Sequence, residues 1–199
     1  IENVVLKQTP GLFTPDIDFV NACLASYGEK DNSLHTGWIL RSQDQPKNRR
    51  SDLAEIDGHL SLIGKRLGYK LGQAQPAQSL DRRALIWQSE DGKVEASFFI
   101  LASAVIGKIT FQFERYLHEN QLSTPHLKVL VGPGGRSRLI LNKIQNNLAL
   151  KNALENGWTF LKFRFVRRLA ENDQITRSIF YNQVNQDPLA NSDPQIPLF

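Results

Sequence analysis

The chain has 199 residues, of which 41% are hydrophobic and 22% charged, so it can bury a sizeable core and is too apolar for a disordered protein. Its formal net charge of +4 permits a nucleic-acid partner without requiring one. The single cysteine, Cys23, excludes an internal disulfide, and no apolar run approaches the roughly 20 residues that a membrane-spanning helix needs. We therefore expect a cytoplasmic protein with no membrane partner.

Three parts of the chain differ in composition. Residues 1–50 are predicted to be a lead-in with one short helix, a short strand over 38–40 and a polar linker over 43–50. Residues 51–182 are predicted to form the main domain, and residues 183–199 a flexible tail, because Asn, Asp and Pro dominate there. The chain begins at Ile1 and contains no methionine, so we expect it to be a fragment or a processed product of a larger parent protein.

The apolar pattern of the main domain alternates between helical and extended spacing. The predicted elements are a helix over 52–67, strands over 69–74, 84–88 and 94–101, a helix over 103–120, a strand over 127–131, a helix over 136–150, another short helical stretch that ends at 156–157, a strand over 158–165 and a helix over 173–182. Residues 90–93 contain Asp-Gly between two strands, which predicts a tight hairpin turn. This order predicts an α/β (α+β) fold with a central mixed five-stranded sheet flanked by helices.

Three segments resemble the core of the PD-(D/E)xK nuclease superfamily. They read IGKRLGYKLG, RALIWQSEDGKVEASFFIL and LKVLVGPGGR, and the resemblance covers roughly residues 51–165. It implies a restriction-endonuclease-like fold, in which acidic residues on two strands hold divalent metals that activate water. At those positions the present chain carries Ala84, Phe99 and Leu101, none of which can bind a metal. The resemblance therefore implies a degenerate, catalytically inactive domain without a metal or a cofactor.

The resemblance to a nuclease that lacks its catalytic residues implies that the chain is a C-terminal module of a larger bacterial DNA-processing or defence protein, such as a DNA methyltransferase. Such a module binds DNA or positions a partner without cutting. Two alternatives stay open: an active metal-dependent nuclease whose carboxylates lie elsewhere, and a purely structural or oligomerisation domain. A literal Asp-x-Lys occurs at 91–93, with Asp81 or Glu95 as an acidic companion, although Asp-Gly between strands is more typical of a turn.

A Gly-rich segment joins a predicted strand to a predicted helix. Gly132, Gly134 and Gly135 are followed by Arg136 and Arg138, and the free N–H groups at a helix start favour a phosphate. The segment lacks the Gly-Lys-Ser/Thr ending of a nucleotide-binding P-loop, so ATP and GTP are not expected. The alternative is a Gly-rich turn with solvated arginines. The four histidines show no spacing typical of a zinc site.

A second basic segment follows. Lys162 and Arg164 are predicted to project from one face of the fifth strand, and Arg167 and Arg168 continue the cluster. Such a run can follow a nucleic-acid backbone, because each neutralised phosphate releases counterions. A solvated strand face is the alternative.

The last five residues resemble the peptide that binds the bacterial sliding clamp. Gln195 is followed by apolar residues that end in Leu198 and Phe199. The resemblance implies that the two apolar side chains enter a groove of the clamp while Gln195 forms hydrogen bonds at its rim. A plain tail, or a strand docked on its own domain, is the alternative.

Overall fold

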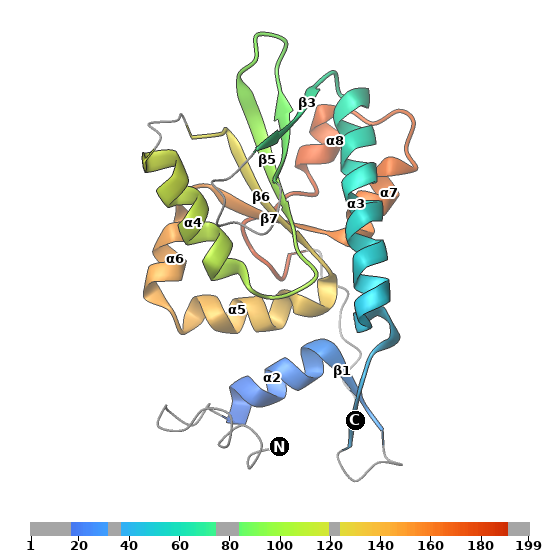
Figure 1. The fold of residues 1–199 in the computed structure, drawn as a ribbon, viewed down its shortest axis with the longest axis vertical. Coiled ribbons are helices and arrows are strands. Elements are labelled where there is room, and N and C mark those ends of the chain that lie inside the picture. Colours follow the sequence, from blue (N-terminus) through green and yellow to red (C-terminus); the bar gives the residue numbers. More distant parts are fainter. Residues whose placement is uncertain (1–16, 32–36, 75–83, 120–123, 191–199) are drawn as a thin grey trace.

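The computed structural model describes residues 17–31, 37–74, 84–119 and 124–190. It shows a mixed α/β fold whose five-stranded sheet, in the order β3-β4-β5-β6-β7, is flanked by helices (Figure 1). The predicted fold class is confirmed at this level. Within the described ranges, no helix combines the length and the apolarity that crossing a membrane demands.

The helices and strands follow one another in the order that the sequence pattern predicts for the main domain, with additional short elements. Their bounds are α2 (Ile17–Tyr27), β1 (Gly28–Lys30), β2 (Trp38–Leu40), η1 (Ser42–Asp44), α3 (Pro46–Arg66), β3 (Lys70–Ala74), β4 (Ala84–Gln88), β5 (Val94–Ile100), α4 (Ile106–Glu119), β6 (Leu127–Gly132), η2 (Gly134–Arg136), α5 (Ser137–Gln145), α6 (Leu148–Glu155), β7 (Trp158–Lys162), α7 (Phe163–Ala170) and α8 (Arg177–Tyr181). Strands β1 and β2 pair with each other as a separate antiparallel ribbon.

The sheet has an antiparallel half and a parallel half. Strands β3, β4 and β5 pair antiparallel, and strands β5, β6 and β7 pair parallel. Parallel neighbours need a crossover connection, which α4 supplies between β5 and β6, and α5 with α6 between β6 and β7. Consequently the segments that follow β5, β6 and β7 all leave the sheet at one edge, which we call the carboxyl edge.

Side chains alternate between two hydrophobic cores on opposite faces of the sheet. In β5, Phe98 belongs to the core beneath α3, α7 and α8, and its neighbour Phe99 belongs to the core beneath α4, α5 and α6. Figure 1 shows these two sets of helices on opposite sides of the strands. Strand β5 is buried on both faces in its middle, as its almost continuous apolar sequence predicts.

The structure corrects two predicted elements that precede β7. The predicted linker over 43–50 is wrong, because η1 and the first turn of α3 occupy it, and α3 runs across the expected domain boundary at 50/51. Pro46 suits this earlier helix start, since its fixed φ favours the first helical position. The helix predicted over 136–150 ends at Gln145, and α6 corresponds to the further short helical stretch predicted to end at 156–157. Asn147 caps α6 by accepting a hydrogen bond from Leu150 N–H at 2.9 Å.

Three further predictions fail toward the C-terminus. The strand predicted over 158–165 ends at Lys162, because Phe163, Val166 and Ala170 follow helical spacing and are buried in the core shared with α3. The helix predicted over 173–182 is the shorter α8. The flexible tail predicted over 183–199 is wrong up to residue 190, because Phe160 and Asn185 exchange both backbone hydrogen bonds, at 2.7 and 3.1 Å. Residues 184–190 therefore lie along the outer edge of β7.

A glycine in α3 provides a test of core packing. A Cβ on Gly64 would lie 2.6 Å from Trp87 Nε1, and Trp87 is held between the rings of Tyr69, Phe98 and Phe180. We predict that Gly64→Ala lowers the free energy of unfolding by about 1–3 kcal/mol, because the indole cannot move aside.

Gly58 in the same helix is the matched control, because a Cβ there would meet nothing within 4 Å. Gly58→Ala should raise the free energy of unfolding by about 0.5–1 kcal/mol, since alanine favours the helix. Urea unfolding followed by circular dichroism measures both variants. Equal effects at the two positions would show that α3 does not pack on Trp87 as described.

Tyr181 provides a test of the same core by pH. Its hydroxyl lies 3.4 Å from that of Tyr69, and burial, followed by this hydrogen bond, raises the pKa of Tyr181 to about 12 from its ordinary value of 10.0. Because the pKa of Tyr181 is higher in the folded state, its protonated hydroxyl raises the free energy of unfolding. This contribution is fully present below pH 10.0 and is lost as the pH rises through about 12. We predict that the free energy of unfolding of the wild type falls as the pH rises from 10.0 to about 12, and that the free energy of unfolding of Tyr181→Phe falls less over the same range. Parallel decreases for both proteins would contradict the prediction.

Candidate nucleic-acid interface

The positions that the nuclease resemblance assigns to metal ligands lie inside the core beneath α4. Ala84, Phe99 and Leu101 are 0%, 3% and 2% exposed. The ring of Phe99 packs against those of Phe113 and Trp158, with centroid distances of 4.8 and 5.3 Å. Apolar side chains thus occupy the positions that the resemblance assigns to metal ligands. In the part of the chain that the structure describes, no group of three or more His, Cys, Asp or Glu side chains could hold a metal ion.

The Asp-Gly-Lys sequence at 91–93 forms the tip of the β4–β5 hairpin, as the turn interpretation predicts. Gly92 has a φ of 84°, a conformation that glycine adopts without steric cost. The Ser89 hydroxyl donates a hydrogen bond to Asp91 Oδ1, and this bond is the main cause that lowers the pKa of Asp91. The second candidate companion, Asp81, lies outside the described residues.

The Gly-rich segment lies at the carboxyl edge, between β6 and α5, where the sequence predicts it. Gly134 and Gly135 are exposed, and cations approach the loop from two sides. Lys162 Cδ lies 3.8 Å from the position that a Cβ on Gly134 would take, and Arg41 Nη1 lies 3.4 Å from that of Gly135. Arg41 was not predicted here, because no local pattern connects the end of β2 with a loop so distant in the sequence.

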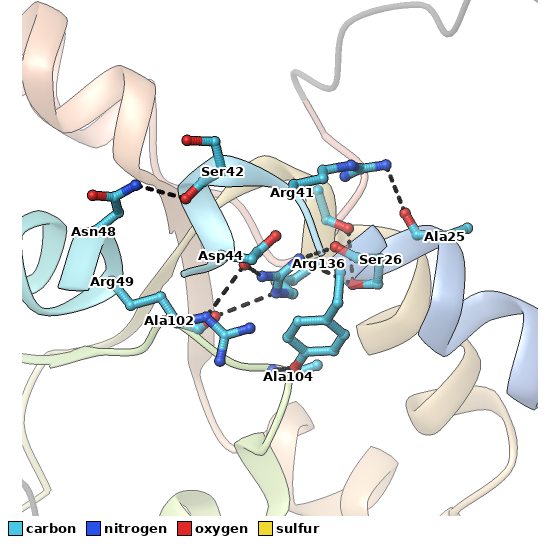
Figure 2. Close-up of polar contacts among 12 residues, drawn as sticks. Ala25, Ser26, Arg41, Ser42, Asp44, Asn48, Arg49, Ala102, Ala104 and Arg136 are labelled. Carbon is cyan, nitrogen blue, oxygen red and sulfur yellow. Dashed lines mark hydrogen bonds and ion pairs between the residues drawn. The ribbon is translucent and has the colours of Figure 1, made fainter. Parts of the chain in front are cut away.

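Arg136 does not face solvent, as Figure 2 shows. It is 1% exposed, and its guanidinium donates hydrogen bonds to the Ser26 carbonyl oxygen, to Asp44 Oδ1 and, at 3.3 Å, to the Ala102 carbonyl oxygen. It also stacks on Tyr27, 3.7 Å from the ring centroid. Arg136 therefore does not present its guanidinium to a phosphate in solvent, although the sequence predicts that it does. This arginine joins the carboxyl edge to the lead-in segment.

The Arg136–Asp44 pair is buried on both sides. Burial is the main cause that lowers the pKa of Arg136, and the carboxylate of Asp44 opposes it. Arg49 Nε lies 3.4 Å from the same Asp44 oxygen, so a second cation supports the carboxylate. Because an unpaired charge in a protein interior costs several kcal/mol, each partner depends on the other.

Further hydrogen bonds attach the lead-in to the same edge. The Ser26 hydroxyl donates to the Gly135 carbonyl oxygen at 3.1 Å, and the Ala104 N–H donates to the Tyr27 hydroxyl at 3.0 Å. Arg41 donates to the Ala25 carbonyl oxygen at 2.8 Å. Helix α2 lies below α5 in Figure 1. The carboxyl edge is thus partly covered by the segment that precedes α3.

The predicted strand face of Lys162 and Arg164 does not exist, because Lys162 ends β7 and Arg164 belongs to α7. Lys162 is buried, and its Nζ donates to the Ala190 carbonyl oxygen at 2.6 Å. Arg164 and Arg168 lie one helical turn apart, 4.8 and 5.6 Å from the centroid of the Phe165 ring. Arg168 is exposed.

Arg167 points toward α3, where its guanidinium contacts acidic side chains. It donates hydrogen bonds to Asp52 at 2.7 Å and to Glu55 at 2.9 Å, and the bond to Glu55 is the main cause that raises the pKa of Arg167. This ion pair joins α7 to α3.

Two cations with side chains that are not buried lie beside the Gly-rich loop. We call Arg41 and Arg138 the basic rim; Arg41 is half-buried, and Arg138 lies in the first turn of α5 and is exposed. The buried Lys162 is not part of it. The tail residues Gln195, Leu198 and Phe199 lie outside the described residues. Comparisons of the chain with protein families, curated proteins and solved structures give no match. The site is therefore interpreted from its own geometry.

Two neighbouring arginines at this edge should respond differently to substitution. Arg136→Met leaves the Asp44 carboxylate buried without its guanidinium, so we predict a loss of about 3–5 kcal/mol in the free energy of unfolding. Arg138→Ala removes an exposed cation and should change it by less than about 0.5 kcal/mol. Chemical unfolding measures both. Should Arg136→Met prove too unstable, Asp44→Asn probes the same pair with a milder change. Small losses for both Arg136→Met and Asp44→Asn would contradict a buried pair.

Proposed function

We propose that this chain is a non-catalytic DNA-binding or partner-positioning module with a nuclease-like fold, and that it acts within a larger DNA-processing protein. The element order supports the fold assignment: helix α3, the antiparallel strands β3 to β5, helix α4 and the parallel strand β6 follow the order that the resemblance to the PD-(D/E)xK superfamily implies. The observation that carries the non-catalytic part is the burial of Ala84, Phe99 and Leu101 in an apolar core.

The basic rim supports a nucleic-acid partner. The exposed loop at Gly134 and Gly135 allows a phosphate to approach the backbone closely, and Arg138 supplies an accessible guanidinium. Contacts of this kind position a protein on DNA without reading its sequence. Since neutralised phosphates release counterions, such binding weakens as the salt concentration rises.

A second candidate, a structural or oligomerisation domain, is favoured by a different observation. Several of the predicted DNA-contacting side chains make contacts inside the chain: Arg136 with Asp44, Arg167 with Asp52, and Lys162 with the Ala190 carbonyl. If the basic residues serve only the fold, the chain has no salt-dependent affinity for nucleic acid.

Fluorescence anisotropy of a labelled DNA duplex at several salt concentrations separates the two candidates. We predict an affinity that falls with salt, and Arg138→Ala should reduce the slope of log Kd against log salt by about one, since one phosphate contact is lost. Arg115→Ala is the matched control, because Arg115 is exposed, pairs with Glu119 at 2.6 Å and lies toward the end of α4 remote from the carboxyl edge. Absence of binding at low salt would favour the structural domain.

Incubation of the same duplex with magnesium or manganese tests the non-catalytic assignment. Intact DNA is expected. Cleavage that EDTA abolishes would mean that functional carboxylates lie elsewhere in the chain, and loss of that cleavage in Asp91→Ala or Lys93→Ala would assign it to the hairpin tip.

A further inference from the structure

An open groove lies where α2, the start of α4 and the connection between α5 and α6 meet. It encloses about 370 Å³, and its apolar walls are formed by Phe19, Val105, Ile106 and Leu150. No residue of the basic rim lines it. A groove of this volume has room for one or two large side chains of a ligand.

The apolar surface extends beyond the groove itself. Val105, Phe111 and Leu148 are 52%, 43% and 71% exposed. A Cβ on Gly107 would lie 3.7 Å from Phe111 and 3.9 Å from Leu150, so the glycine leaves a shallow floor between these two side chains. Single exposed apolar residues are ordinary, whereas neighbouring ones around one groove mark an interaction surface.

The charged side chains that line the groove are both lysines. Lys143 Nζ donates a hydrogen bond to the Ala104 carbonyl oxygen at 2.9 Å, which holds the ammonium group at the groove wall. Lys108 lies in the first turn of α4 and is exposed. Among the described lining residues there is no Asp or Glu to neutralise these cations. An occupant with negative charge is therefore complementary to the groove.

We propose that this groove binds a short peptide segment of a partner protein, in which large apolar side chains are flanked by Asp or Glu. The apolar side chains pack over Gly107 between Phe111 and Leu150, and the carboxylates lie near Lys108 and Lys143. Apolar walls favour a peptide over DNA, whose interfaces are polar and strongly basic. The inference goes beyond the proposed DNA binding and uses a different set of residues.

The test is a titration of ¹⁵N-labelled protein with the synthetic peptide acetyl-Asp-Glu-Leu-Phe-Glu-Asp-amide. Shift changes are expected at the amides of residues 105–108 and 146–150, and Lys108→Glu should weaken binding by about tenfold through charge reversal. Lys65→Glu on α3 makes the same charge change on an exposed residue outside the groove and should leave the affinity unchanged. The peptide with Ser-Ser in place of Leu-Phe, and the peptide with lysines in place of its acids, should not bind.

Three results would overturn the proposal. The first is an absence of binding, or shifts outside the groove. The second is a DNA affinity that Lys108→Glu lowers more than Lys65→Glu does, which would assign the groove to the DNA interface. The third is a dimer in light scattering that Leu148→Ser dissociates, which would assign the groove to a second copy of the chain. DNA affinity is therefore measured for the wild type and for Lys108→Glu. Equal affinities would show that peptide binding and DNA binding use different residues, so either proposal can fail without the other.

Discussion

The buried pair of Arg136 and Asp44 is the interaction on which the carboxyl edge depends. It joins the loop after β6 to the segment before α3, and Tyr27 covers the guanidinium on one side. A buried pair adds little net stability compared with an apolar pair of the same shape, but removal of one partner is costly. The pair therefore specifies one arrangement of the lead-in on the sheet, and this arrangement brings Arg41 beside Gly135.

The positions that the nuclease resemblance assigns to metal ligands are part of an apolar core in this fold. Carboxylates at the positions of Ala84 and Phe99 would require a metal or other cations to compensate their desolvation. The apolar residues present there need no such partner, and burying a side chain as large as Phe99 contributes about 1.5–3 kcal/mol. Packing alone thus holds the fold together at this point, which agrees with the non-catalytic role proposed above.

The basic rim and the apolar groove both arise from the parallel half of the sheet. The crossover that leads from β5 into α4 places Val105 and Lys108 at the groove, while the loop after β6 presents Gly134 to the rim. The two surfaces have different chemistry, since one offers backbone and guanidinium groups and the other apolar walls with lysines. The two proposals together place DNA at the basic rim and a partner peptide at the groove.

The spacing of apolar residues and the Asp-Gly turn in the sequence determined most of the sheet, because β4, β5 and the hairpin between them depend on residues that are neighbours in the chain. The same reasoning misread α7, since Leu161, Phe163 and Phe165 alternate as a strand would, and only packing against α3 decides for a helix. The tertiary structure alone decided which cations face solvent. Arg136 meets Ser26 and Asp44 across 110 and 92 residues of chain, and Lys128 is buried because Glu114 of α4 lies 2.5 Å away. The physical reason is that a charged side chain is buried only where another segment of the chain supplies its partner. The residues next to it in the sequence do not indicate which segment that is.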